Sequence, residues 1–365
     1  MNSKSYSNQV SQQTAHSSQG RIQEIRSYLL YINPDEIHII IVIGRAIQYE
    51  TDGSLEGFNE WNTWCQDSVK YPGKNACLEM WLMYRKHISS EPVTIASMIH
   101  FYTKALVKIG QFDVIQNLDC DKNGQIKKTV KNALIMIQYS DVFGKLQFDE
   151  MKFNELLNDN QIDEHAILKF MVCLDITYSV SFSKPVINDA VKLAGQLDRI
   201  NPVQDYLYSI SWDGIPRLNE FLIQHAGAKD CEYTRLVTSK TLIAAVARVF
   251  APGCKVDTTL VLEGPQGCGK STLISSLAPD ANWFSDTELP IGSKDAYQQL
   301  QGIWLFEIGE MSSVAKANTS TLKSFLSAAV DKFRPPYGAR VVDSPRRAIF
   351  IGTTNDDQYL NDESG

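Results

Sequence analysis

The chain has 365 residues, of which 44% are hydrophobic and 21% charged, a balance typical of globular proteins with two or three domains. The net charge of −7 excludes a uniformly basic nucleic-acid coat but leaves room for a local basic channel. The 7 cysteines are scattered and form no C-x-x-C pair, which favours reduced thiols in the cytoplasm over a disulfide framework or a zinc site. Neither a signal peptide nor an apolar run long enough to span a membrane is visible.

The N-terminal part divides into a tail and a helical region. Residues 1–20 are rich in Ser, Gln and Asn and predict a disordered tail. Residues 21–110 predict a small helical domain, in which Asn33, followed by a proline and two acids, is expected to start a helix. Trp61 and Trp64 follow at helical spacing. Such a pair can stack on nucleic-acid bases, but the spacing favours a place in the core.

The middle of the chain, residues 111–200, is interpreted as a mixed, mostly helical linker domain. Residues 119–125 resemble a calcium-binding loop, but Val130 stands where such a loop needs a glutamate. We therefore interpret the stretch as a turn before a helix over 125–138, with basic residues at its start.

The following stretch leads to a glycine-rich motif. It predicts a helix over 201–207, a tight turn over 212–218 and an apolar helix over 236–250. Pro252 and Gly253 then end the last helix.

The glycine-rich motif has the form G-x-x-x-x-G-K-S over residues 264–271, the Walker A pattern of a phosphate-binding loop. Apolar and β-branched residues over 258–262 predict a buried strand before it, and residues 272–277 predict a helix after it. The glycines let main-chain N–H groups face phosphate oxygens, Lys270 can reach the β- and γ-phosphates, and Ser271 can ligate Mg²⁺. The alternative interpretation is a glycine turn without nucleotide binding, in which Lys270 and Ser271 follow by chance. The predicted ATP-binding residues are Gly264, Gln266, Gly267, Cys268, Gly269, Lys270, Ser271 and Thr272.

Two further apolar stretches lead to polar residues that a phosphate-binding loop enzyme needs. Residues 303–306 predict a strand ending at Glu307, which is expected to hold the Mg²⁺ shell, and Glu310 is placed to polarise the attacking water, although these two roles could be exchanged. A strand over 348–352 is followed by Asn355, whose amide suits a sensor of the γ-phosphate. The alternative for Glu307 and Glu310 is an ordinary strand that ends in surface acids, and the alternative for Asn355 is an ordinary turn. The catalytic candidates are Lys270, Glu307, Glu310 and Asn355, and the metal ligands are Ser271 and Glu307.

Basic and aromatic residues alternate over residues 331–340. Cations for the backbone and rings for the bases suit single-stranded nucleic acid, although the same stretch would suit an intersubunit surface. The candidate DNA contacts are Arg334, Tyr337 and Arg340. Arg346 and Arg347 could line a channel or reach a neighbouring subunit's γ-phosphate, or they could be solvated arginines on a strand edge.

The N-terminal helical region resembles the type-two primase C-terminal module of phage and plasmid primases. The segments that carry this resemblance are residues 31–35, 43–47 and 57–61. The module contains no catalytic residues, and the polymerising domain that usually precedes it is absent from this sequence.

Residues 201–365 resemble the virulence-associated E family of phage and genomic islands, which is related to superfamily-three AAA+ helicases. The segments that carry this resemblance are residues 205–207, 212–214, 252–257, 264–272, 292–297, 307–310, 334–338 and 352–356. The resemblance implies an α/β fold with an AAA+-like parallel sheet. It also implies ATP hydrolysis coupled to DNA unwinding or remodelling by a homo-oligomeric ring, in the replication of a mobile element.

The sequence stops at Gly365, before the arginine-containing stretch with which the family continues. We therefore expect a truncated form that binds nucleotide but turns it over slowly, with the phosphate-loop strand at a sheet edge. Two alternatives stay open: a hydrolysis-deficient protein that binds DNA or replication partners, and a small-molecule kinase that uses the same loop.

Overall fold

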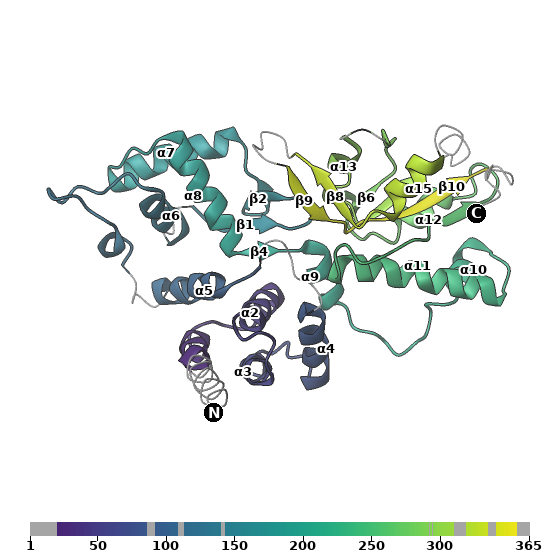
Figure 1. The fold of residues 1–365 in the computed structure, drawn as a ribbon, viewed down its shortest axis with the longest axis horizontal. Coiled ribbons are helices and arrows are strands. Elements are labelled where there is room, and N and C mark those ends of the chain that lie inside the picture. The colour runs from purple at the N-terminus through teal and green to yellow at the C-terminus, as the bar shows by residue number, and fades with distance from the viewer. Residues whose placement is uncertain are drawn as a thin grey trace, which may run out of the picture. The chain divides into compact units, whose positions relative to one another are not determined.

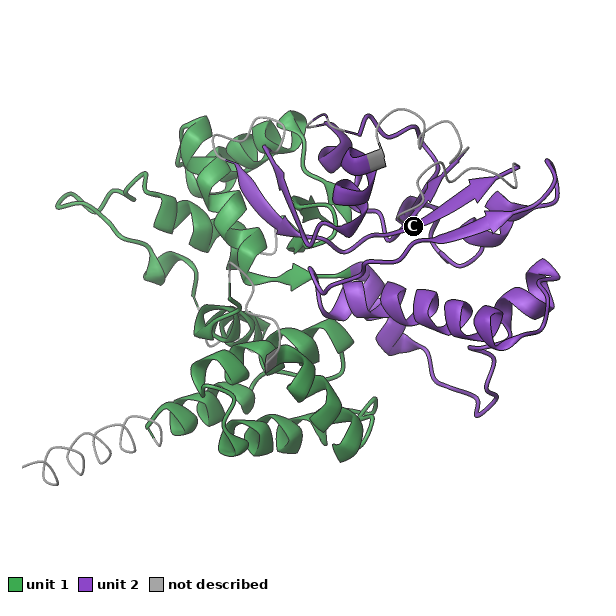
Figure 2. Cartoon of the chain, turned by 45° about the vertical axis from the view of Figure 1, so that its right-hand side comes forward, with its two compact units in different colours: residues 1–201 green, residues 202–365 purple. Residues whose placement is uncertain are grey.

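The computed structural model describes residues 20–85, 92–108, 113–139, 143–291, 293, 295–309, 319–334 and 341–355. The chain forms two compact units, residues 1–201 and residues 202–365, which Figure 2 colours separately. Both units combine helices with strands, so the fold is mixed α/β. None of the helices in the described segments has the length and hydropathy needed to cross a membrane. The predicted tail over residues 1–20 lies outside the described residues, apart from Gly20.

The first part of unit 1 is a group of helices around α2 (Figure 1). Its helices are α2 (Ile37–Glu50), α3 (Leu55–Cys65), α4 (Lys74–Arg85) and α5 (Ile95–Lys108). The predicted helix start at Asn33 is wrong by about one turn, because α2 begins at Ile37. The side chain of Asn33 instead accepts the amide N–H of Asp35 at 3.1 Å, which stabilises a turn ahead of the helix.

The tryptophans of α3 belong to the core of this helical group, as their spacing favoured. Trp61 is 0% and Trp64 is 5% exposed. The indole N–H of Trp61 donates to the carbonyl of Ile40 at 3.1 Å, and that of Trp64 donates to the carbonyl of Ile32 at 2.9 Å. A Cβ on Gly44 of α2 would lie 2.7 Å from the Trp61 ring, so the close approach of the two helices depends on this glycine.

The second part of unit 1 combines helices with a small sheet that sequence patterns did not predict. Its elements are η1 (Ile115–Asn117), α6 (Val130–Tyr139), β1 (Leu146–Asp149), β2 (Asn154–Leu157), β3 (Asn160–Gln161), α7 (Glu164–Tyr178), α8 (Lys184–Leu197) and β4 (Arg199–Ile200). The strand order is β3-β2-β1-β4, with β1 antiparallel to β2 and parallel to β4. Apolar residues of α6, α7 and α8 form the core.

The turn predicted around Asp121 is present, but the helix after it is shorter than expected. The carboxylate of Asp121 accepts the amide N–H groups of Asn123 and Gln125 at 2.8 and 2.9 Å. Because the backbone is held in this turn, α6 begins at Val130 rather than at Gln125. The basic residues expected in its first turn therefore precede the helix.

Unit 2 is built around a parallel four-stranded sheet of order β5-β10-β7-β6 (Figure 1). Its strands are β5 (Leu260–Glu263), β6 (Phe284–Ser285), β7 (Leu305–Ile308) and β10 (Ile349–Thr354), and β8 (Val330–Phe333) with β9 (Val342–Pro345) forms a separate antiparallel hairpin. Its helices are α9 (Pro202–Ser209), α10 (Phe221–Ala226), α11 (Glu232–Phe250), α12 (Lys270–Ser275), η2 (Ala281–Trp283), α13 (Asp295–Gln299) and α15 (Thr319–Ser327).

The central strands of this sheet are buried, and its two edge strands, β5 and β6, are not. Every residue of β7 and β10 is buried, and Phe306 of β7 and Phe350 of β10 pack with Phe325 of α15. Three of the four residues of β5 are half-buried and the last is exposed. The prediction of a buried strand over 258–262 is therefore wrong, whereas the expected edge position of the phosphate-loop strand is confirmed for the described sheet, with β10 as its neighbour.

Arg346, which follows β9, is a buried structural residue. It is 1% exposed, and its guanidinium donates to the carboxylate of Asp331 at 3.0 and 2.5 Å and to the carbonyl of Phe325. The guanidinium also lies 4.8 Å from the ring centre of Phe325 and 5.3 Å from that of Phe350. All three sequence interpretations of Arg346, namely channel lining, contact with a neighbouring subunit's γ-phosphate and a solvated edge residue, are therefore wrong, because the side chain is buried and paired within its own unit.

Candidate nucleotide-binding site

A glycine-rich loop, residues 264–269, connects β5 to α12. Gly267 and Gly269 have φ angles of +77° and +88°, a backbone conformation that residues with a Cβ rarely adopt. These two glycines allow the chain to turn back from the end of β5 and start α12 at Lys270. The loop therefore presents main-chain groups and the Lys270 side chain at the carboxyl end of a parallel strand.

The ammonium group of Lys270 joins the loop to the end of β10. Its Nζ donates to the carbonyl oxygens of Gly264 and Pro265 at 2.7 and 3.0 Å. It also donates to Asn355 Oδ1 at 2.9 Å. Since Asn355 comes directly after β10, one cation links two neighbouring strand ends.

A second hydrogen-bonded group joins α12, β7 and β10. The hydroxyls of Ser271 and Thr353 both donate to Glu307 Oε1, each at 2.7 Å. Glu307 is 3% exposed, and its second oxygen, Oε2, has no hydrogen-bond partner among the described residues. A buried carboxylate oxygen of this kind, beside a serine hydroxyl, is a suitable ligand for a hard divalent cation.

The topology of the sheet explains why these side chains meet. The three strands β5, β10 and β7 are adjacent and parallel, so their carboxyl ends lie at one edge. In the register of β7 and β10, Glu307 is paired with Ile351. Thr353 follows Ile351 by two residues on β10, so its side chain is on the same face of the sheet and near Glu307. Ligands of open parallel α/β sheets bind at this edge as a rule.

Family comparisons match two separate parts of the chain. Residues 207–365 match the model of the virulence-associated protein E-like domain, and residues 25–101 match the model of primase C terminal 2. Both resemblances predicted from sequence are thereby confirmed. A search among curated proteins returned no match to the chain.

The segment that matches the virulence-associated protein E-like model contains every site residue predicted from sequence, and the structure brings four of them together: Lys270, Ser271, Glu307 and Asn355. The strand before Glu307 is displaced from its predicted position, because β7 starts at Leu305 and Glu307 lies inside it. The other loop positions surround Lys270: Gln266, Cys268 and Thr272 are exposed, and Gly264 is half-buried.

Sequence patterns missed Thr353, whose hydroxyl helps to hold Glu307. Its signal was the polar Thr-Thr pair at the end of an apolar strand.

The predicted DNA contacts are described in part. Arg334 is exposed directly after β8, and its carbonyl accepts the side-chain N–H of Gln298 at 2.9 Å. Tyr337 and Arg340, and the catalytic candidate Glu310, lie outside the described residues. Their predicted roles therefore stay predictions.

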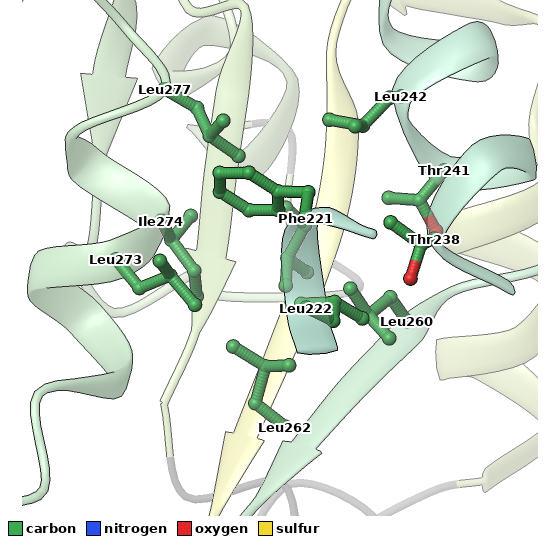
Figure 3. A pocket seen from close by; sticks show the side chains of 11 residues that line it. Phe221, Leu222, Thr238, Thr241, Leu242, Leu260, Leu262, Leu273, Ile274 and Leu277 are labelled. Carbon is green, nitrogen blue, oxygen red and sulfur yellow. The ribbon is translucent and has the colours of Figure 1, made fainter. Parts of the chain in front are cut away.

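An apolar crevice lies between helices α10, α11 and α12 and the strands β5 and β10. Figure 3 shows Leu260 and Leu262 of β5 close to Phe221 and Leu222 of α10, with Leu273 and Ile274 of α12 opposite. Its volume is about 20 Å³, enough for roughly one water molecule and too small for a nucleotide. The apolar side chains that line the crevice therefore pack α12 against the sheet, and the crevice itself is not a ligand site.

Proposed function

We propose that the virulence-associated protein E-like domain is a magnesium-dependent ATP hydrolase that acts on DNA during the replication of a phage or other mobile element. The observation that carries the proposal is the meeting of Lys270, Ser271, Glu307 and Asn355 at one edge of a parallel sheet, beside a glycine-rich loop. Main-chain amides and an ammonium group suit a triphosphate, and a carboxylate with a hydroxyl suits its magnesium ion.

Binding of ATP requires Lys270 to change its partners. In the structure its three N–H donors are directed to two loop carbonyls and to Asn355. Carbonyl oxygens are weaker partners than phosphate oxygens, because hydrogen bonds between two charged groups are shorter and stronger. The β- and γ-phosphates would therefore displace the two carbonyls from Lys270 and open the loop around the triphosphate.

Ser271 and Glu307 would hold the magnesium ion. Glu307 Oε2 is buried without a hydrogen-bond partner in the described part of the chain, which suits an oxygen that coordinates a metal ion when the ion binds. The described residues contain no group of three or more His, Cys, Asp or Glu that could hold a metal alone. Magnesium at nucleotide sites takes one or two protein ligands together with phosphates and water, and it neutralises charge on the transferred phosphoryl group.

Asn355 would contact the γ-phosphate and the attacking water, since its amide can both donate and accept. Glu310 is the proposed residue for polarising that water. Arg334, Tyr337 and Arg340 are the proposed contacts to single-stranded DNA, and the primase-related module supports a role on DNA. By analogy with related motors, the working form would be a ring of identical subunits.

Phosphate release tests this proposal. The wild-type chain should release phosphate from Mg-ATP, faster with single-stranded DNA, and Lys270→Ala should release it at the rate of a protein-free blank. Lys240→Ala is the matched control, because Lys240 is an exposed lysine of the same domain on α11. Equal background rates for wild type and Lys270→Ala would contradict hydrolysis and favour a protein that binds DNA or partners without turnover.

A further inference from the structure

Unit 1 contains a cavity of about 470 Å³, which is within the usual range of roughly 300–1,000 Å³ for ligand pockets. Its walls come from the segment before α2, from α2, α5 and α6, from the segment before β1, and from the residue after α8. These elements are distant in sequence and meet around the cavity. It is independent of the glycine-rich loop, all of whose residues belong to unit 2.

Three buried polar side chains line this cavity. Asp198 is 0%, Gln138 is 7% and His38 is 9% exposed. Each has one atom without a hydrogen-bond partner among the described residues, namely Asp198 Oδ2, Gln138 Oε1 and His38 Nε2. Because buried polar groups in folded proteins nearly always have partners, three such atoms around one cavity indicate a missing polar ligand.

The neighbours of Gln138 and Asp198 leave one acceptor atom unpaired on each of these two side chains. Gln138 Nε2 donates to the ring of His100 at 2.8 Å, so the acceptor Oε1 is left over. The other carboxylate oxygen of Asp198 accepts from Gln147 at 3.2 Å.

His38 lies between two carboxylates, with Nδ1 3.5 Å from Glu36 Oε2 and Nε2 3.8 Å from Asp198 Oδ1, so its ring N–H can be directed to either one. Burial lowers the pKa of His38 to about 4, so its ring is neutral at pH 7. The inner part of the cavity thus requires hydrogen-bond donors.

The outer part of the cavity has positive charge and aromatic rings. Lys104 and Lys145, with 29% and 42% of their side chains exposed, line it together with the exposed Lys108. Lys104 Nζ lies 3.9 Å from Asp198 Oδ2, and Lys145 Nζ lies 3.9 Å from Glu36 Oε2, so neither lysine is held in a close ion pair. The rings of Phe101, Tyr31 and Tyr139 complete the wall. Lysines suit phosphate, and aromatic rings suit a planar base.

We propose that this cavity binds a nucleotide whose base carries an exocyclic amino group, either as a free nucleotide or as one unit of a DNA strand. The amino group donates to the inner acceptors Asp198 and Gln138, the base lies against the aromatic wall, and the phosphate lies at Lys104 and Lys145. A base that presents a carbonyl oxygen in place of the amino group sets an acceptor against the inner acceptors and binds less tightly.

Titration calorimetry on the full chain tests this proposal with dAMP and dTMP, each at matched concentration, and with oligo(dA) and oligo(dT). We expect dAMP or oligo(dA) to bind at least tenfold more tightly than its thymine counterpart. Binding of dAMP supports a free nucleotide as the ligand. Binding of oligo(dA) but not of dAMP, with a preference over oligo(dT), supports one nucleotide of a DNA strand as the ligand. Binding of neither adenine ligand, or equal binding of dAMP and dTMP, overturns the proposal, whereas equal binding of the two oligonucleotides reports only the proposed DNA contacts of unit 2.

Four variants locate the binding in the cavity. Lys104→Met and Lys145→Met should each weaken adenine binding at least fivefold, whereas Lys169→Met, which removes an exposed lysine of α7, should leave it unchanged. Asp198→Asn should reduce the preference for adenine over thymine, because the amide can also donate. Adenine binding should be the same in Lys270→Ala, and its loss there would assign the signal to the glycine-rich loop and overturn the proposal. Thermal unfolding identifies any variant that fails to fold, and the remaining lysine variant then decides.

Discussion

Replacing Arg346 with methionine tests whether this arginine belongs to the fold or to the chemistry of the site. The side chain is 1% exposed and forms its closest ion pair, at 2.5 Å, with Asp331, whose side chain is 3% exposed. Removing one partner of a buried pair leaves the other charge uncompensated, at a cost of about 3–5 kcal/mol. For a domain of this size the melting temperature should fall by about 6–20 °C.

The size of the loss should depend on pH. Burial raises the pKa of Asp331, and the ion pair with Arg346 opposes that rise. Without Arg346 the pKa of Asp331 rises further, so protonation relieves the buried charge more readily as the pH falls. The difference in stability between wild type and Arg346→Met should therefore be smaller at pH 5 than at pH 8.

Urea unfolding followed by tryptophan fluorescence measures these effects, with Trp283 and Trp304 as reporters in unit 2. Arg217→Met is the matched control: Arg217 is also paired with an aspartate, but on an exposed turn, so the unfolding midpoint should not move. A variant with Arg346→Met and Asp331→Leu together should regain much of the lost stability. If Arg346→Met keeps the wild-type midpoint while ATP turnover is abolished, the structural assignment of Arg346 is wrong.

Three further predictions concern single side chains. Burial holds the pKa of His38 at about 4, below its ordinary 6.5, so between these pH values the unfolded chain binds a proton that the folded chain does not. The free energy of unfolding of the wild type should therefore decrease as the pH is lowered. Between pH 7 and pH 5, His38→Gln should lose about 2 kcal/mol less than wild type, as measured by urea unfolding. Gly44→Ala places a Cβ 2.7 Å from Trp61 and should lower the free energy of unfolding by about 1–3 kcal/mol. Alkylation of the exposed Cys268, whose sulfur lies 3.8 Å from Lys270 Nζ, should block nucleotide turnover, and ATP should slow the alkylation as followed by mass spectrometry.

Each of these predictions has a control. For His38, an identical pH dependence in wild type and variant would show that its proton is not responsible. For Gly44, the control is Gly20→Ala, where an added Cβ meets no atom within 4 Å and stability should not fall. For Cys268, Cys268→Ser should be insensitive to the reagent, and loss of turnover in that treated variant would place the damage at another cysteine.

The candidate site was largely readable from sequence because its parts follow local patterns. A strand, a glycine turn and a lysine can be recognised within about a dozen residues, and Glu307 and Asn355 each follow an apolar run. Parallel strands then bring their carboxyl ends to one edge by topology alone. The prediction omitted Thr353, because the Thr-Thr pair at the end of the apolar strand does not show which side chain it holds; the contact with Glu307 depends on the pairing of β10 with β7.

Features that depend on distant contacts could not be predicted in this way. Arg346 follows a polar, basic stretch whose composition predicts exposure to solvent. Its burial depends instead on contacts with Asp331 and with Phe325 of α15. The cavity in unit 1 joins His38, Gln138 and Asp198, which no local pattern could associate.

The central claim is that the glycine-rich loop and the acid of β7 form one magnesium-nucleotide site. The most direct test is calorimetric binding of a slowly hydrolysed ATP analogue to the full chain, with and without magnesium. Wild type should bind more tightly with magnesium, Ser271→Ala and Glu307→Gln should lose that gain, and Lys270→Ala should weaken binding at least tenfold under both conditions. Nucleotide affinity that is unchanged by Lys270→Ala, or a magnesium effect that survives both Ser271→Ala and Glu307→Gln, would contradict the account.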